Sequence, residues 1–289
     1  MRWSAGGRSS NLEDRRGMSA GGGGFGFGRG MGIGGTVILL ILSLIFGRDF
    51  IGGSDGGGAA YPDQTTASGG EVGPVRSTPE EERAVDFTSA VLDSVQNTWH
   101  RILPQETGRQ YQDAKLVLYR DAVRTGCGTA PSSVGPFYCP MDQKVYIDLS
   151  FYDELRQRFG APGDFAQAYV IAHELGHHVQ HLLGTDEKVQ QLQQSRPDLK
   201  NAASVRLELQ ADCYAGVWAK SDQNVIEPGD IDEALAAASA VGDDRLQRAA
   251  RGSVNPDTFT HGTAAQRSAW FKRGFDSGDV KSCDTFSGT

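Results

Sequence analysis

The chain has 289 residues and a formal net charge of −8 at neutral pH. This acidic balance argues against nucleic acid as a partner, because phosphate contacts require clustered Lys and Arg side chains. The first 75 or so residues are not composed like a folded domain, since thirteen of the first 35 are Gly and no apolar periodicity begins before Ile33.

The N-terminal part of the sequence predicts a membrane anchor. Residues 1–30 form a Gly-rich basic head with five Arg against two acidic residues, and residues 31–47 are uncharged and largely apolar. A stretch of about 17 residues is at the short end of what spans a bilayer, and the preceding positive charge predicts a cytoplasmic N-terminus. A cleaved signal peptide is the alternative, but no Ala-x-Ala site follows the apolar stretch. The sequence therefore predicts a single-pass protein of the cell membrane whose remaining residues lie outside, in the periplasm or the extracellular space.

Residues 48–77 are rich in Gly, Ser and Pro and predict a flexible linker. Residues 78–289 are then expected to form one folded domain. Its first helix begins at Thr78, because Pro79 suits the first helical position and Glu81 completes a capping box. The same helix is expected to end at Pro104.

The rest of the domain predicts two strands followed by helices. The strands, at 114–119 and 144–148, flank a turn-rich patch. Helices are expected at 151–159, 165–183, 202–220, 231–250 and 263–275. The predicted fold class is α+β, mostly helical with a small antiparallel sheet, and preceded by one transmembrane helix.

Four Cys residues, an even number, allow two disulfides if the domain faces an oxidising compartment. Sequence alone leaves three pairings open. Cys127 and Cys139 are close enough in sequence to staple the turn-rich patch, and Cys283 is one candidate partner of Cys213.

The chemistry of the chain centres on His173-Glu-Leu-Gly-His177 in the expected helix 165–183. Residues four apart lie on one helix face, so both imidazoles can bind one metal ion, and Glu174 can reach a water molecule beside it. Zinc catalysis needs such nitrogens, an open position for water and a nearby base. Downstream, Glu208 and Asp212 are also four apart on an expected helix. One of them can complete the ligand set while the other accepts the outer N–H of a ligand His.

These motifs resemble the gluzincin pattern of metallopeptidases and, more narrowly, the bacterial putative neutral zinc metallopeptidase family. The strings that carry the resemblance are Gly135-Pro-Phe-Tyr-Cys-Pro140, Val145-Tyr-Ile-Asp-Leu-Ser150, His173-Glu-Leu-Gly-His-His-Val-Gln180, Glu208-Leu-Gln-Ala-Asp-Cys-Tyr-Ala-Gly216, Gly242-Asp-Asp244 and His261-Gly-Thr263. The Gly-rich N-terminus with a single anchor also fits the family.

The resemblance implies a compact gluzincin-like domain with one Zn²⁺ ion. His173, His177 and Glu208 would be the zinc ligands, Glu174 the general base, and Asp212 the partner of a ligand His, expected to be His173. The active cleft would lie between a sheet edge and helix 165–183.

Two further roles are expected from position. His261 precedes an expected helix and is a candidate donor to the oxyanion that develops during peptide hydrolysis, while a structural or capping His is the alternative. Strand 145–148 could pair with the substrate backbone, and an ordinary interior strand is the alternative.

The sequence thus predicts a membrane-tethered zinc metallopeptidase, endopeptidase-like, that hydrolyses peptides or proteins by metal-activated water. The alternative is a non-catalytic zinc protein at the membrane that binds peptides or scaffolds a partner. Glu174 favours the enzyme, because a pure binding site has no use for a base there. A di-iron helical site would need a second Glu-x-x-His unit, and the sequence contains none.

Overall fold

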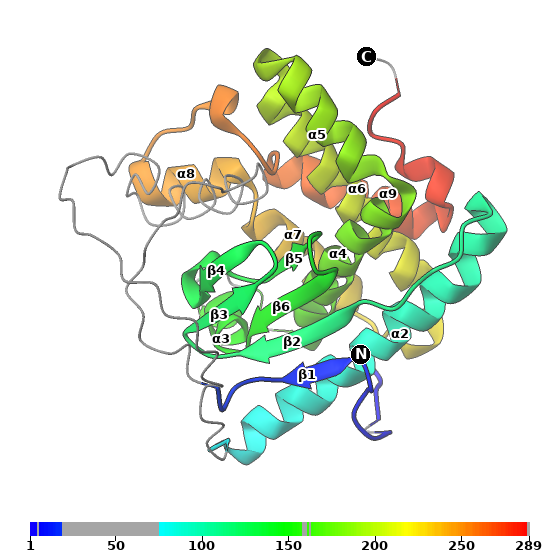
Figure 1. Ribbon diagram of the computed structural model, residues 1–289, viewed down its shortest axis with the longest axis vertical. Helices are drawn as coiled ribbons and strands as arrows, with labels where there is room; N and C mark the ends of the chain where they lie inside the picture. Colours follow the sequence, from blue (N-terminus) through cyan, green and yellow to red (C-terminus); the bar gives the residue numbers. More distant parts are fainter. Residues whose placement is uncertain (5, 19–74, 158–160, 162, 288–289) are drawn as a thin grey trace, which may run out of the picture.

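The computed structural model describes residues 1–4, 6–18, 75–157, 161 and 163–287. In this part of the chain a four-stranded sheet with the order β1-β2-β6-β5 packs against a group of helices (Figure 1). Its strands are β1 (Leu12–Asp14), β2 (Lys115–Tyr119), β5 (Phe137–Cys139) and β6 (Lys144–Asp148).

The sheet is mixed, so the expected antiparallel sheet is wrong. The two predicted strands became β2 and β6, which pair in parallel with Leu116 opposite Val145. Only β5 runs antiparallel to its neighbour β6. The physical reason is the long connection at 120–143, which carries the chain back to the starting end of β2, as parallel pairing requires. This connection also forms a separate hairpin of β3 (Ala122–Thr125) and β4 (Gly128–Pro131).

The two faces of the sheet enter different cores, because successive side chains of a strand point to opposite faces. Leu116, Leu118, Val145 and Ile147 belong to the large core that the helices share. On the other face, Val117 and Tyr119 of β2 and Tyr146 of β6 pack with Val123 of the β3–β4 hairpin. The sheet is therefore buried on both faces near β2 and β6.

The helix α2 (Pro79–Thr107) begins as predicted but ends later. The Thr78 hydroxyl accepts a hydrogen bond from the Glu81 amide at 3.2 Å. The helix continues through Pro104, because a Pro this close to the end removes only one helical hydrogen bond. Gly108, in the left-handed conformation, then ends it by donating its N–H to the Pro104 carbonyl.

The other helices of the described residues are α3 (Ser150–Gln157), α4 (Asp164–Leu183), α5 (Thr185–Ser195), α6 (Lys200–Ser221), α7 (Asp230–Ala240), α8 (Asp243–Arg251) and α9 (Ala264–Ser277). The single helix expected at 231–250 is broken into α7 and α8. The break is at Gly242, whose backbone lies so close to Ala264 that a Cβ there would be 2.3 Å from the Ala264 nitrogen. Helix α5 was not among the predicted helices.

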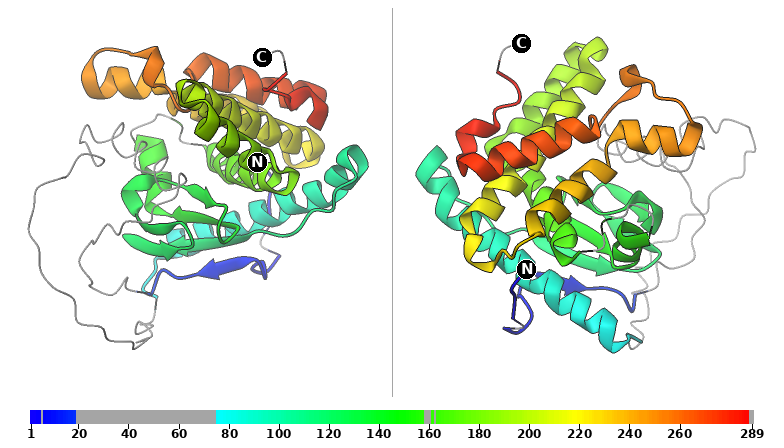
Figure 2. Two further views of the ribbon diagram at one scale, coloured as in Figure 1. Left: turned by 45° about the horizontal axis from the view of Figure 1, so that its top comes forward. Right: turned by 180° about the vertical axis from the view of Figure 1, so that it is seen from behind.

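Helices α6 and α9 pack with their backbones in close contact at Gly216 and Gly274. A Cβ on Gly274 would be 1.9 Å from the Cys213 carbonyl oxygen, and one on Gly216 would be 2.1 Å from the Phe271 carbonyl oxygen. The two helices lie against each other in both views of Figure 2. The absence of a side chain at these two positions therefore sets the distance between the helices.

Both disulfides join the pairs that the sequence favoured. Cys127–Cys139 ties the β3–β4 turn to strand β5. Cys213–Cys283 joins α6 to the C-terminal segment.

The transmembrane helix and the single-pass membrane localisation are not supported. Within the described residues no helix combines the length and apolar character needed to cross a bilayer, and the expected span at 31–47 lies outside those residues. In addition, the N-terminal head was expected across a membrane from the domain, yet β1 pairs in parallel with β2, Leu12 opposite Leu116. A strand cannot hydrogen-bond to a sheet from which a bilayer separates it, so the expected arrangement is wrong.

Other contacts also hold the N-terminal residues to the body. The guanidinium of Arg16 is buried and pairs with Asp14 at 2.7 Å and with Glu82 on α2 at 2.9 Å. The ring of Trp3 packs edge to face on Phe87, with centroids 5.4 Å apart. Figure 1 shows β1 lying along β2 and beside α2. Residues 1–4 and 6–18 are thus part of the folded body.

The packing of α6 on α9 leads to a first prediction. Gly274→Ala places a methyl group inside the Cys213 carbonyl contact, and overpacking of this kind costs about 1–3 kcal/mol of unfolding free energy or more. Urea denaturation measures the change. Gly6→Ala is the control, because a Cβ there meets nothing within 4 Å and should alter stability by less than about 0.5 kcal/mol. Equal stability of the two variants would contradict the packing.

The docking of the N-terminal residues should weaken in acid. Hydrogen bonds from Ser77, Arg8 and Arg16 lower the pKa of Glu82 from 4.5 to about 2. The contribution of this carboxylate is therefore complete above pH 4.5 and is lost as the pH falls toward 2. Trp3 fluorescence, obtained as the difference from a Trp3→Phe variant, should report the release. Glu82→Gln should diminish the acid transition, and an unchanged transition in that variant would refute the assignment.

Candidate metal centre

Helices α4 and α6 bring together three of the predicted site residues. One ligand atom from each of His173, His177 and Glu208 lies within 4.8 Å of the others. The Nε2 atom of His173 is 3.2 Å from Glu208 Oε2, and Nε2 of His177 is 3.5 Å from Glu208 Oε1. Zinc bonds of about 2.0–2.2 Å at tetrahedral angles would separate neighbouring ligand atoms by about 3.3–3.6 Å. The three side chains therefore lie close enough together to share one zinc ion, with each imidazole facing a different oxygen of Glu208.

The approach of the two helices follows from their small residues. A Cβ on Gly176 would be 3.1 Å from the Ala211 carbonyl oxygen. This agrees with the expectation that Gly176 and Ala211 permit close packing. The His side chains on α4 consequently reach the carboxylates on α6 directly.

The outer nitrogen of His173 faces Asp212, as the resemblance implied. Its Nδ1 donates to Asp212 Oδ1 at 2.9 Å, which leaves Nε2 directed at Glu208. Burial lowers the pKa of His173, but Asp212 and Glu208 outweigh it and raise this pKa to about 9. A metal ion therefore competes with a proton for Nε2, and its affinity should increase with pH.

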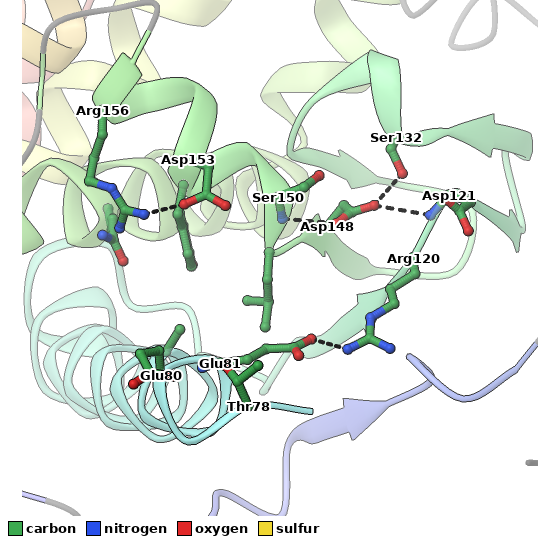
Figure 3. Close-up of a pocket in the computed structure, with 14 residues that line it drawn as sticks. Thr78, Glu80, Glu81, Arg120, Asp121, Ser132, Asp148, Ser150, Asp153 and Arg156 are labelled. Atoms are coloured by element: carbon green, nitrogen blue, oxygen red, sulfur yellow. Dashed lines mark hydrogen bonds and ion pairs between the residues drawn. The ribbon is translucent and has the colours of Figure 1, made fainter. Parts of the chain in front are cut away.

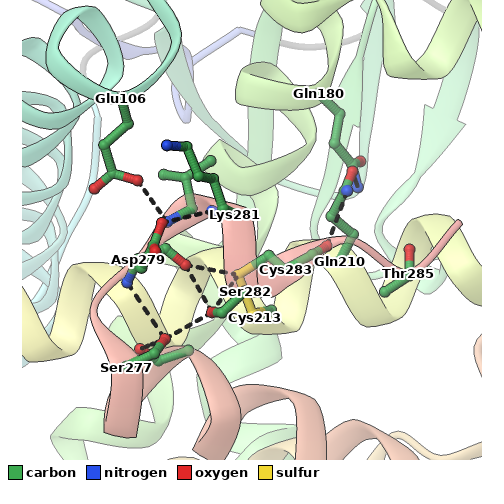
Figure 4. Close-up of a disulfide and its surroundings, with 12 residues drawn as sticks. Glu106, Gln180, Gln210, Cys213, Ser277, Asp279, Lys281, Ser282, Cys283 and Thr285 are labelled. Atoms are coloured by element: carbon green, nitrogen blue, oxygen red, sulfur yellow. Dashed lines mark hydrogen bonds between the residues drawn. A yellow bond between two sulfur atoms is a disulfide. The ribbon is translucent and has the colours of Figure 1, made fainter. Parts of the chain in front are cut away.

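The outer nitrogen of His177 faces an amide instead of a carboxylate. Its Nδ1 donates to Gln180 Oε1 at 2.8 Å. The Gln180 amide nitrogen in turn donates to the Leu207 carbonyl and to Gln210 Oε1. Figure 4 shows Gln180 and Gln210 beside the Cys213–Cys283 disulfide, where Gln210 Nε2 donates to the Cys283 carbonyl at 3.0 Å. This chain of amides fixes the His177 ring, and sequence analysis missed both Gln residues.

Glu174 lies in the same buried region, with only 8% of its surface exposed. Burial raises the pKa of its carboxyl, while the two neighbouring imidazoles of His173 and His177 act in the opposite direction. Glu208 differs, because its contacts with His177 and His173 overcome burial and hold its pKa well below the usual value. The surroundings of the two carboxyl groups thus shift their pKa values in opposite directions.

His261 is held beside this centre by Asp243. The fully buried Asp243 carboxylate accepts the backbone N–H groups of Thr260, His261 and Gly262 at 2.6–3.0 Å. It also pairs with His261 Nδ1 at 3.1 Å. Burial lowers the pKa of His261, but Asp243 and the charge of Glu208 raise it above its usual value. Asp243 had no role in the sequence analysis, although its string Gly242-Asp-Asp244 contributed to the resemblance.

Arg267 is a further residue that sequence analysis missed. It projects from α9, is 4% exposed, and pairs through Nε with Asp212 Oδ2 at 2.8 Å. Its position one turn after the His261-Gly-Thr263 string was the available signal.

The neighbouring His residues have other partners. His178 is fully buried; its Nε2 donates to the Gln112 carbonyl, and its Nδ1 accepts the Tyr138 hydroxyl at 3.0 Å. Burial lowers the pKa of His178 to about 4, so this ring is neutral. His181 pairs with Asp186 at 2.7 Å, near the end of α4. The described contacts give His178 a structural role that links α4 to β5.

Strand 145–148 does not offer a free edge for substrate. It is β6, and it lies between β2 and β5. The interior-strand alternative is therefore correct. The edge strand near α4 is β5, which Tyr138 ties to His178.

Two other polar features lie away from this centre. Oxygen atoms of Asp164, Asp230 and Glu233 cluster, but the Met1 amine already lies 2.7 Å from Asp164. A pocket of about 520 Å³ lies between α2, α3 and the ends of β2 and β6. Figure 3 shows the residues that line it. Both of its Arg residues pair with acidic residues of the pocket, Arg120 with Glu81 and Arg156 with Asp153. None of the predicted site residues lines it.

Comparisons with known proteins agree with the motifs. The family described as putative neutral zinc metallopeptidase matches residues 1–286. The uncharacterized protein YpfJ of Escherichia coli (strain K12) is 50% identical over 293 residues, covering 99% of each chain. The uncharacterized protein Rv2575 of Mycobacterium tuberculosis is 47% identical over 211 residues, covering 68% of this chain and 69% of its own. No solved structure matches the chain significantly. The family resemblance predicted from the motifs is confirmed.

The amide chain behind His177 leads to a prediction about metal affinity. Gln180→Leu removes the acceptor for His177 Nδ1, and losses of this kind weaken metal binding by about 10–100-fold. Competition with a chromophoric chelator measures the zinc dissociation constant. Gln193→Leu is the matched control, because Gln193 is also buried but bonds to Ser204 and Lys200. Equal affinities of the two variants would contradict a role for Gln180 at the metal.

Proposed function

We propose, from the premise that this chain belongs to the putative neutral zinc metallopeptidase family, that it hydrolyses peptide bonds with a zinc ion held by His173, His177 and Glu208. The observation that carries the proposal is the convergence of one ligand atom from each of these three residues to within 4.8 Å, with the buried Glu174 carboxyl beside His173 in sequence. The substrate is a peptide or protein.

Zinc bound there would supply a Lewis acid that lowers the pKa of water and polarises a substrate carbonyl. Residues of the chain carry out the proton transfers. Glu174 accepts a proton from the attacking water as the new C–O bond forms at the carbonyl carbon. It then gives this proton to the amine nitrogen as the C–N bond breaks, so one water is consumed. The raised pKa of Glu174 makes its carboxylate a stronger base toward the attacking water.

His261 would stabilise the negative charge that develops on the carbonyl oxygen. Its Nδ1 is engaged with Asp243, which leaves Nε2 as the donor. The raised pKa of His261 favours the protonated ring that such a donor requires. The carboxylates of Asp243 and Glu208 favour protonation of this ring, while the charge of Arg267 acts in the opposite direction.

The substrate backbone would lie along β5. Among the strands of the described sheet, β5 pairs on one side only, with β6. Main-chain groups on the other side of an edge strand can pair with an extended peptide. The Tyr138–His178 hydrogen bond fixes the position of this strand relative to α4, which carries His173, Glu174 and His177.

The decisive test is peptide-library cleavage followed by mass spectrometry, with the zinc-loaded full chain and its Glu174→Gln variant. We expect cleavage by the wild type and a loss of at least about 10²–10⁴-fold in the variant, the usual contribution of a general base. Zinc content and the melting temperature of the variant should remain unchanged, since Gln is nearly isosteric with Glu.

Two results would count against the proposal. A folded, zinc-loaded wild type that cleaves nothing would favour a non-catalytic zinc protein that binds peptides. Cleavage that persists in Glu174→Gln would remove Glu174 as the base.

A further inference from the structure

We infer that Arg267 is a positioning residue of the metal centre, which acts on His173 through Asp212 and thereby sets the affinity of the site for zinc. This inference rests on the zinc site of the proposed function. It concerns metal binding and does not depend on peptide cleavage.

The guanidinium of Arg267 forms two hydrogen bonds with the Asp212 carboxylate. Nε donates to Oδ2 at 2.8 Å, and Nη2 donates to Oδ1 at 2.9 Å. Both side chains are almost completely buried, with 4% of Arg267 and none of Asp212 exposed. Such a fork fixes the plane of the carboxylate as well as its position.

The fixed plane decides which oxygen faces His173. Asp212 Oδ1 receives His173 Nδ1, the Tyr169 hydroxyl and Arg267 Nη2, whereas Oδ2 is bonded to Arg267 Nε. Without Arg267, Oδ2 would be a buried acceptor lacking this charged partner, and the carboxylate could rotate. Rotation would turn Oδ1 away from His173 and release the ring that presents Nε2 to the metal.

Arg267 also reaches the ligand set itself. Its Nη2 lies 3.8 Å from Glu208 Oε2 and 3.3 Å from the Tyr169 hydroxyl on α4. The same Nη2 lies 3.3 and 3.4 Å from Nδ1 and Nε2 of His173, so it also packs against the ring that Asp212 orients. One guanidinium from α9 thus contacts side chains of both α4 and α6. The close contact of Gly216 with the α9 backbone holds α9 near enough to α6 for Arg267 to make these contacts.

The test compares Arg267→Lys with Arg273→Lys, the same substitution at an exposed position of the same helix. Lys keeps the charge but cannot form the two-point contact with Asp212. We expect the zinc dissociation constant, measured by chelator competition, to rise about 10–100-fold in Arg267→Lys and to stay unchanged in Arg273→Lys. The melting temperature of the metal-free proteins reports folding separately.

A second set of variants keeps the inference open to refutation if Arg267→Lys does not fold. The double variant that carries both Asp212→Asn and Arg267→Gln removes the two buried charges together. Proteins tolerate this better than the loss of one partner of a buried ion pair. Because Arg267 acts through Asp212, this double variant should bind zinc no more weakly than Asp212→Asn alone. Additive losses would show an independent effect and overturn the inference.

Other outcomes separate this inference from the proposed function. If Arg267→Lys lowers the metal-free melting temperature but binds zinc like the wild type, Arg267 is only structural and the inference fails. A wild type that binds zinc without cleaving peptides removes the proposed function and leaves the inference intact. A folded wild type that binds no zinc overturns both.

Discussion

The candidate metal centre depends on one close contact, that of α4 with α6 at Gly176 and Ala211. Any side chain at Gly176 would push against the α6 backbone, only 3.1 Å from the position of its Cβ. With the helices this close, His173 and His177 on one and Glu208 on the other meet at the spacing of zinc ligands. Side chains of ordinary length would not converge in this way from helices packed much farther apart.

The helix pair alone would leave the two imidazole rings free to turn, and distant parts of the chain prevent this. His173 is oriented from α9 through Asp212 and Arg267. The His177 ring is oriented through Gln180 and an amide chain that ends at the Cys213–Cys283 disulfide. Residues far apart in sequence therefore converge on the two outer nitrogens, and the C-terminal third of the chain is needed to complete the centre.

The contrast between local helix spacing and contacts from distant segments explains which features of the site could be predicted from the sequence. The i, i+4 spacing of His173 with His177 and of Glu208 with Asp212 is a local property of a helix, so these residues were identified as candidates before the structure was known. Other features depend on contacts between residues far apart in the sequence. The predicted strand direction and the unbroken helix across Gly242 were wrong, and the pairing of β1 with β2 was not predicted. The membrane arrangement failed for the same reason, since the composition of 31–47 carries no information on where residues 12–14 pack.

The charges of the centre tie metal binding to folding. Three carboxyl groups, those of Glu174, Glu208 and Asp212, are largely buried within the site, and the guanidinium of Arg267 faces two of them. Carboxylates removed from water are costly unless they are paired. Arg267 pairs closely with Asp212, whereas Glu208 lies farther from the guanidinium, at 3.8 Å, and otherwise faces imidazoles that must be neutral to bind a metal. A dication between His173, His177 and Glu208 would add positive charge beside these carboxylates, so the electrostatics of the site favour a metal ion as its spacing does.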